Sequence, residues 1–230
     1  MSLPIILITG QLLTDAVWQP LLDAWDDREV IVADNRSDDT IEGFARRLLD
    51  NAPPKFVLIA HAMGGFVVFR VMPRAPERVA KLAPIPTLAS ADGPAQTARR
   101  QGYIDLVTSG RFDQVVEERI PILFPEEKRD DERLLGIARK MAADTGADTF
   151  LAQQRAIMAR IDSRPRLGEI RVPTLLIWGE KDGITSRAHH DEILEAIPGA
   201  RLEVVAGAGH LPTVEAPEVV VSLLTDFIDA

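Results

Sequence analysis

The 230-residue sequence contains no cysteine, a single tyrosine and only 5% aromatic residues. Disulfide bonds, cysteine nucleophiles and thiolate metal sites are therefore excluded, although a lack of cysteine does not identify the compartment. The sequence also has fewer basic than acidic residues. It contains 26 lysines and arginines and 35 aspartates and glutamates, which gives a formal net charge of -9. This sign disfavours broad binding to nucleic-acid phosphates or to an anionic membrane surface.

The sequence also has no long hydrophobic run. The longest stretches without charge, residues 1–14 and 56–69, are interrupted by glycine and polar residues and are too short to span a bilayer. No lysine or arginine precedes Arg28, and the apolar stretch Leu3–Ile8 is too short for a secretion signal. We therefore expect an unsecreted, cytoplasmic protein without a transmembrane helix.

Composition and periodicity predict a single folded α/β domain over residues 1–230. The values of 46% hydrophobic and 27% charged residues are typical of soluble globular proteins. Short apolar runs alternate with segments of helical period, the pattern of parallel strands covered on both faces by crossover helices. The predicted strands are Pro4–Thr9, Glu29–Ala33, Lys55–Ala60, Lys81–Ile85, Thr174–Gly179 and Arg201–Val205.

Helical patterns fill the segments between these strands. Apolar residues recur at helical spacing over residues 18–25 and again over residues 41–48, where Asp39 or Thr40 can cap the helix. Between Ile85 and Thr174 we find no strand pattern, but two further helical stripes at residues 134–141 and 150–161. We therefore expect a helical lid subdomain, residues 86–170, inserted within the α/β domain.

The third predicted strand runs into the sequence Ala60-His61-Ala62-Met63-Gly64 and then into a buried helix. Strand, sharp turn and helix are the setting of a nucleophile elbow, whose signature is G-x-S-x-G. Replacing the first glycine by Ala60 is sterically tolerable. Replacing the central serine by Ala62 removes the hydroxyl, so the chain has no nucleophile at the elbow.

The elbow and three further segments resemble the α/β-hydrolase superfamily over nearly the whole chain. Residues 179–185 (Gly-Glu-Lys-Asp-Gly-Ile-Thr) resemble its acid loop, residues 207–211 (Gly-Ala-Gly-His-Leu) its histidine loop, and residues 9–13 the loop after its first strand. The order nucleophile, acid, histidine is that of the superfamily. The resemblance implies an α/β-hydrolase fold, a mostly parallel sheet flanked by helices with a helical lid, and a catalytic triad of Ala62, Asp182 and His210.

Acyl transfer requires a base and an acid with defined positions. An imidazole must take the proton of a serine hydroxyl, and a carboxylate must fix the imidazole tautomer. His210 and Asp182 suit these roles, with the neighbouring Glu180 as a competing acid. We interpret His61 as structural, because a residue beside the nucleophile points elsewhere on so sharp a turn.

Two backbone N–H groups must face the developing oxyanion. The resemblance assigns one to Met63 and the other to Gln11, with Leu12 as the second choice. In the predicted lid, Gln154 and Arg155 are candidate substrate contacts.

His189 and His190 lie in a polar helical segment and are expected to be solvated, not metal ligands. In the same way, Arg160 and Arg164 of the predicted lid either meet an acidic substrate or are simply solvated. No metal and no cofactor are expected.

Three explanations of Ala62 remain open. The chain is a serine-to-alanine variant of a hydrolase that acts on a small carboxylic ester or lactone through an acyl-enzyme. Alternatively, it is a natural non-catalytic protein that binds a small ligand, or a lyase or cofactor-free oxygenase that uses His210 and Asp182 as a general base. Each explanation implies a small-molecule partner and neither nucleic acid nor membrane; the oligomeric state is left open.

Overall fold

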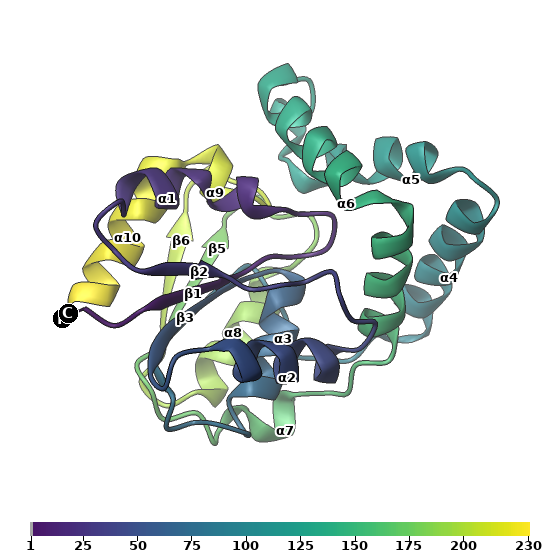
Figure 1. The fold of residues 1–230 in the computed structure, drawn as a ribbon. Coiled ribbons are helices and arrows are strands. Elements are labelled where there is room, and N and C mark those ends of the chain that lie inside the picture. Colours follow the sequence, from purple (N-terminus) through teal and green to yellow (C-terminus); the bar gives the residue numbers. More distant parts are fainter. Residues whose placement is uncertain (1) are drawn as a thin grey trace.

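A computed structural model describes residues 2–230, and a parallel β-sheet forms its centre. Strands pair in the order β2-β1-β3-β4, while β5 pairs with β6. A parallel bridge between Leu82 and Thr174 joins the two groups, so the six strands follow in the order β2-β1-β3-β4-β5-β6 (Figure 1). The strands are β1 (Ile5–Ile8), β2 (Val30–Val32), β3 (Phe56–His61), β4 (Val79–Ile85), β5 (Leu175–Gly179) and β6 (Arg201–Val205). All six predicted strands are thus confirmed.

Helices surround the sheet and fill the gap between β4 and β5. They are α1 (Gln19–Ala24), α2 (Ile41–Asn51), α3 (Met63–Val71), α4 (Pro94–Thr108), α5 (Phe112–Arg119), α6 (Glu132–Met158), α7 (Arg164–Leu167), α8 (Arg187–Ala196), α9 (Pro212–Glu215) and α10 (Pro217–Asp229). Short 3-10 turns are η1 (Asp15–Trp18), η2 (Pro121–Leu123) and η3 (Glu126–Lys128). Thr40, not Asp39, caps α2, because its hydroxyl accepts the N–H of Gly43 at 2.9 Å.

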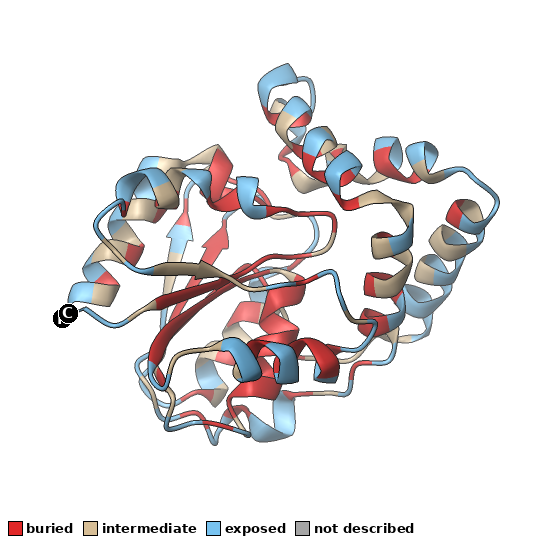
Figure 2. Cartoon of the chain, viewed as in Figure 1, coloured by how far each residue is buried: buried red, intermediate tan, exposed pale blue. Residues whose placement is uncertain are grey.

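The alternation of side chains along each strand builds two hydrophobic cores. Ile5 and Leu7 belong to the core that contains α1 and α10, whereas Ile6 and Ile8 belong to the core that contains α2, α3 and α8. The two groups of helices lie on opposite faces of the sheet (Figure 1). The central strands are therefore buried on both faces (Figure 2). Burial of each aliphatic side chain stabilises the fold by about 1.5–3 kcal/mol. The sheet therefore holds the loops at its ends in defined positions.

The segment between β4 and β5 forms α4 to α7 and contains no strand. We call it the helical insertion. Its longest helix, α6, is two helical segments joined at Gly146, whose backbone (φ 76, ψ 168) is not helical. This break explains why the sequence shows two separate helical stripes.

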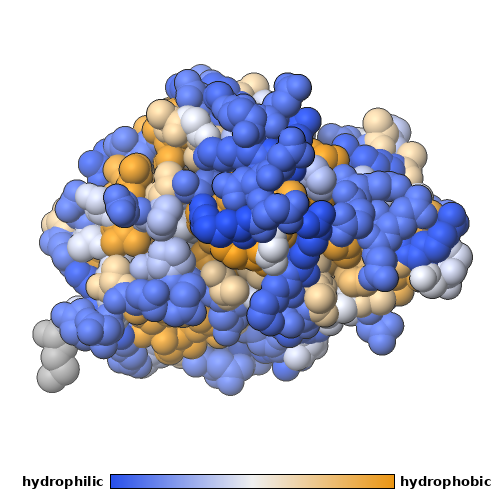
Figure 3. Space-filling model, turned by 90° about the horizontal axis from the view of Figure 1, so that it is seen from above, coloured by the Kyte–Doolittle hydropathy of each residue, from blue (hydrophilic) through white to orange (hydrophobic). Residues whose placement is uncertain are grey.

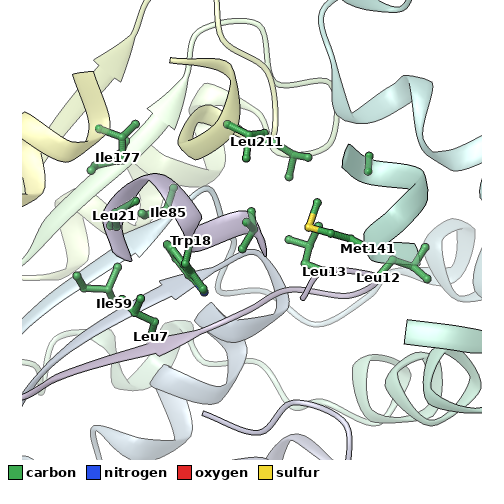
Figure 4. Packing of buried hydrophobic residues seen from close by; sticks show 14 of the residues in the cluster. Leu7, Leu12, Leu13, Trp18, Leu21, Ile59, Ile85, Met141, Ile177 and Leu211 are labelled. Atoms are coloured by element: carbon green, nitrogen blue, oxygen red, sulfur yellow. The ribbon is translucent and has the colours of Figure 1, made fainter. Parts of the chain in front are cut away.

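The helical insertion shares a core with the sheet. Leu12 and Leu13, in the loop after β1, pack beside Met141 of α6 (Figure 4). Hydrophilic residues cover most of the face seen from above, with hydrophobic residues in smaller patches between them (Figure 3). None of the helices in residues 2–230 has the length and apolar character that a bilayer crossing requires.

Candidate active site

Ala62 occupies the turn between β3 and α3 with an unusual backbone conformation. Its φ is 50 and its ψ is -111, a region that costs an L-amino acid about 1–3 kcal/mol. Neighbouring groups hold this turn: the Ala62 N–H donates to the carbonyl of Ile85 at 3.0 Å, and its carbonyl accepts the Thr87 hydroxyl at 2.8 Å. The sharp turn predicted for the elbow is therefore present.

Two glycines allow the backbone to pack this closely at the elbow. A Cβ at Gly64 would lie 2.6 Å from the carbonyl oxygen of Ile8, so α3 can approach β1 only with glycine there. A Cβ at Gly10 would lie 2.8 Å from the Cβ of Ala62. Both distances are too short for a real Cβ contact. The close packing around position 62 therefore requires glycine at positions 10 and 64.

Asp182 and His210 meet beside this turn, although they follow different strands. Asp182 lies after β5 and His210 after β6, and the Asp182 Oδ2 to His210 Nδ1 distance is 2.8 Å. The other carboxylate oxygen accepts the N–H groups of Ile184 at 2.7 Å and Thr185 at 3.1 Å. Burial acts to raise the pKa of Asp182, but the imidazole of His210 and these hydrogen bonds outweigh it and lower the pKa to about 2. Asp182 is therefore an ionised acceptor at neutral pH.

The remaining ring nitrogen of His210, Nε2, makes no hydrogen bond to any residue in the described range 2–230. His210 lines the same cavity as Ala62, and its own backbone N–H is held by the carbonyl of Leu123 at 2.8 Å. Glu180, the competing acid, instead accepts the N–H of Gly207 at 3.0 Å. The geometry thus pairs His210 with Asp182.

The cavity has a volume of about 570 Å³ including its open mouth. Residues of the loop after β1, the elbow, the histidine loop and the helical insertion all contribute to it. Its lining is Gln11, Leu13, Ala62, Met63, Phe66, Pro86, Thr87, Leu88, Arg100, Arg119, Leu123, Ile157, Ile184, Thr185 and His210. A hollow lined mainly by apolar side chains with a few polar groups is typical of a small-molecule site.

The two candidate oxyanion amides differ in availability. Met63 is the first residue of α3, so its N–H has no acceptor within the helix. The N–H of Gln11 makes no hydrogen bond to the described residues, whereas the N–H of Leu12 donates to the Gln153 side chain at 3.2 Å. Gln11 and Met63 therefore remain free to face a ligand in the cavity, and Leu12 does not.

Sequence reasoning missed the side chains that hold this loop. Gln153 of α6 also donates from Nε2 to the carbonyl of Asn35 at 3.1 Å, and Asn35 donates to the carbonyl of Gly10 at 3.0 Å. The two bonds of Gln153 join residues more than a hundred positions apart, so no local pattern could have identified them. They connect the helical insertion to the loop that carries Gln11.

His61 is packed inside the protein and does not line the cavity. Its ring lies 6.0 Å from the ring of Trp18 and 5.6 Å from that of His210, centroid to centroid. Burial, together with the nearby charge of His210, lowers the pKa of His61 to about 3. This neutral, enclosed ring is consistent with a structural role.

The expectation that His189 and His190 are both solvated is wrong for His190. Its ring is buried against Trp178 of β5, and its Nδ1 lies 3.0 Å from the carbonyl oxygen of Ser186. Burial lowers the pKa of His190 to about 4. The helical spacing of α8 turns His190 inward and leaves His189 partly exposed. Within residues 2–230 no three histidine or carboxylate side chains gather in a way that could hold a metal ion.

The predicted substrate contacts Gln154 and Arg155 do not line the cavity. Gln154 is buried and accepts a hydrogen bond from Arg100 at 3.1 Å, while the exposed Arg155 lies 3.7 Å from Asp39. Arg160 and Arg164 are likewise held in ion pairs with carboxylates. The arginines that do reach the cavity are Arg100 and Arg119.

The profile of the alpha/beta hydrolase family matches residues 5–223. This chain belongs to the alpha/beta hydrolase family. A pimeloyl-[acyl-carrier protein] methyl ester esterase of Photobacterium profundum is 28% identical over 239 aligned residues, which cover 97% of this chain and 94% of that protein.

Solved structures of similar proteins show the same fold. A thermophilic esterase from Thermogutta terrifontis, with malate bound, superposes with a TM-score of 0.90 at 25% identity and covers 100% of this chain and 90% of its own. An enol-lactonase from Burkholderia xenovorans superposes with a TM-score of 0.89 at 21% identity, covering 100% of this chain and 92% of its own. The predicted α/β-hydrolase fold is confirmed.

Proposed function

We propose that this chain is the alanine form of a serine hydrolase that acts on a small carboxylic ester or lactone. The observation that carries the proposal is the strained backbone of Ala62 at the end of β3, in the cavity that His210 also lines. An alanine side chain has no reactive group, so the strained turn gives it no catalytic role. A serine there would expose its hydroxyl to the ligand and to an imidazole that Asp182 orients.

The names of similar proteins support the same substrate class. They include an esterase of a methyl ester, a further esterase and an enol-lactonase. Esters and lactones share one reaction, the attack of an oxygen nucleophile on an acyl carbon. The proposal therefore rests on chemistry that these names have in common and not on any one substrate.

With serine at position 62, each residue has a defined step. His210 takes the hydroxyl proton on Nε2 while the oxygen bonds to the acyl carbon, and Asp182 stabilises the imidazolium. The N–H groups of Met63 and Gln11 face the oxyanion. Collapse breaks the bond to the leaving alcohol, which receives the proton, and His210 then activates water to release the acid. The helical insertion acts as the lid of this site.

The alanine itself favours a second candidate, a protein that binds a small ligand without converting it. Without a hydroxyl the acyl-enzyme cannot form, yet the cavity, the free amides and the ionised Asp182 remain. A third arrangement, in which His210 and Asp182 act as a general base on the ligand or on water, needs no nucleophile at position 62. Only the first candidate predicts that a serine at position 62 creates an acyl-enzyme and hydrolytic turnover.

The substitution Ala62→Ser tests the proposal. We expect it to create turnover of esters or lactones and labelling by a fluorophosphonate probe, because the base and acid are already positioned. Activity should be measured over a panel of short esters, lactones and thioesters, with labelling read by mass spectrometry.

Matched double variants show whether the new activity uses the proposed residues. Adding His210→Ala to Ala62→Ser should lower turnover by roughly three orders of magnitude or more, while adding Glu180→Gln should leave turnover nearly unchanged. An Ala62→Ser protein that folds but neither labels nor turns over any member of the panel would contradict the hydrolase proposal and favour the binding protein.

A further inference from the structure

Arg119, the last residue of α5, lines the cavity and has no counter-ion. Its Nε is enclosed and makes no hydrogen bond to any residue in the range 2–230, and no carboxylate among them pairs with it. Its guanidinium lies over the rings of Tyr103 and Phe150, 5.1 and 5.8 Å from their centroids. These rings hold the cation but do not neutralise it.

A second cation reaches the same part of the cavity. Arg100 pairs through Nε with Asp92 at 2.5 Å and bonds through Nη1 to Gln154, but its Nη2 has no partner among the described residues. Asp92 also pairs with Arg160 at 2.8 Å, so one carboxylate is shared between two arginines. The cluster therefore keeps a positive charge beside Arg119.

The unpaired charge is held at a cost. Burial and the nearby Arg100 lower the pKa of Arg119 to about 10, which still leaves it protonated at neutral pH. Arg119 is partly exposed to the cavity, and a partly buried cation without a counter-ion is destabilising, so its ordinary complement is an anion. The net charge of the whole chain is -9, so this local excess of positive charge is opposite in sign to the net charge.

The two arginines line the same cavity as Ala62 and His210, the residues at its reacting end. Arg100 and Arg119 also line a neighbouring cavity of about 520 Å³, including its mouth, together with Arg99. They thus stand where the two cavities meet. The wall that they share with Ala62 and His210 is otherwise largely apolar, with Leu13, Phe66, Leu123 and Ile157. This wall suits the methylene chain of a ligand that reaches from position 62 to the arginines.

We propose that Arg119, with Arg100, binds a carboxylate that the substrate carries away from its scissile bond. The substrate is then a half-ester of a dicarboxylic acid or a lactone that bears a free acid. A carboxylate fits because its two planar oxygens match the unpaired N–H groups of a guanidinium. This inference rests on the proposed function for the scissile bond, but the anion site itself can be tested without any turnover.

The chain with Ala62 is suited to the test because it lacks the serine hydroxyl that the proposed hydrolysis requires. Calorimetric titration should compare monomethyl adipate, a carboxylate half-ester, with dimethyl adipate, its neutral counterpart. We expect the half-ester to bind about 10- to 100-fold more tightly at low salt, and this preference to weaken as salt is raised. Equal affinity of the two ligands in the unaltered protein would overturn the proposal.

Variants identify the residue responsible. Arg119→Gln should remove most of the preference for the half-ester, and Arg119→Lys should retain part of it. Arg155→Gln, an exposed arginine outside the cavity, should retain all of it. If a folded Arg119→Gln protein kept the preference for the half-ester over the diester, the assignment of the anion site to Arg119 would be overturned. The assignment to a carboxylate would be overturned if the phosphonate that corresponds to the half-ester bound more tightly than the half-ester. Should Arg119→Gln not fold, the comparison of ligands in the unaltered protein still decides the matter.

The two proposals fail in different ways. Preference for the half-ester in the unaltered chain, combined with an inactive Ala62→Ser protein, would support the anion site and contradict the hydrolase. Turnover of neutral esters by Ala62→Ser without any preference for the half-ester would support the hydrolase and contradict the anion site.

Discussion

Asp182 shows how a single carboxylate connects the site to the stability of the fold. Burial acts to raise its pKa, but the imidazole of His210, the Thr185 hydroxyl and the backbone N–H of Ile184 overcome this effect and lower the pKa from the usual 3.8 to about 2. A group whose pKa is lower in the folded than in the unfolded state stabilises the fold where it is ionised. The contribution is present above about pH 4 and is lost as the pH falls through 2.

The substitution Asp182→Asn should reveal this linkage. At neutral pH we expect the variant to be less stable by about 2 kcal/mol, the energy equivalent of the pKa shift. Because the native carboxylate becomes protonated in acid, the difference should shrink as the pH falls from about 5 to about 2.5. Urea unfolding of both proteins across this range measures it. A difference that stays constant with pH would show that the charge of Asp182 is not responsible.

Which site residues could be read from the sequence depended on their neighbours along the chain. Asp182 and His210 lie in short glycine-containing loops after predicted strands, and they contact each other in the structure as expected. Arg119 and Gln153 have no such setting, since each acquires its surroundings from segments distant in the sequence. The expectation that Arg155 meets the substrate is wrong, because α6 directs this arginine to the surface and away from the cavity.

At the scale of the elements, the sheet was predictable and the helical insertion only in part. Strands buried on both faces must be almost entirely apolar, so all six were visible as short hydrophobic runs. In the insertion, α6 shows clear stripes, but α4 exposes most of its residues and lacks a strong apolar face. Its place in the fold is decided by contacts with α5 and α6 that no local pattern encodes.

The break in α6 gives a prediction with a control in the same helix. Gly146 has φ 76 and ψ 168, a conformation that is essentially restricted to glycine, so Gly146→Ala should destabilise the protein by about 1–3 kcal/mol. Gly136 is exposed, has helical backbone and has nothing within 4 Å of an added Cβ. Gly136→Ala should therefore stabilise by about 0.5–1 kcal/mol.

Urea unfolding of the two glycine variants separates these effects. Opposite changes in the free energy of unfolding would agree with a break that only glycine can form. If both substitutions stabilised the protein equally, α6 would be continuous in solution and the break at Gly146 would be wrong.

Over the whole molecule, several contacts fasten the helical insertion to the rest of the domain, and two of them lie at the cavity and at the point where the chain leaves the sheet. One is the contact of Gln153 with the loop after β1. The other is the neck, which we define as residues 86–92 and 159–164, where the chain leaves and rejoins the sheet. In the neck the Ser163 N–H donates to the carbonyl of Ala89 at 2.9 Å, and Arg160 bonds to Ser90 and lies over the ring of Phe66. These contacts join the two chain segments of the neck to each other and to Phe66 of α3.

Asp92 is the centre of the neck, and removing it tests how far the cavity depends on this attachment. Its side chain is 3% exposed, and although burial acts to raise its pKa, Arg160 and Arg100 lower it. Asp92→Ala leaves two buried guanidinium groups without a counter-ion, so we expect a loss of about 3 kcal/mol or more and faster hydrogen exchange in α4 to α6 than in the sheet. Asp39→Ala is the control, because its pair with Arg155 is exposed on both sides and should matter by less than about 1 kcal/mol. Equal stability of the two variants, or exchange that rises uniformly over the chain, would show that the ion pairs at Asp92 do not hold the insertion in place.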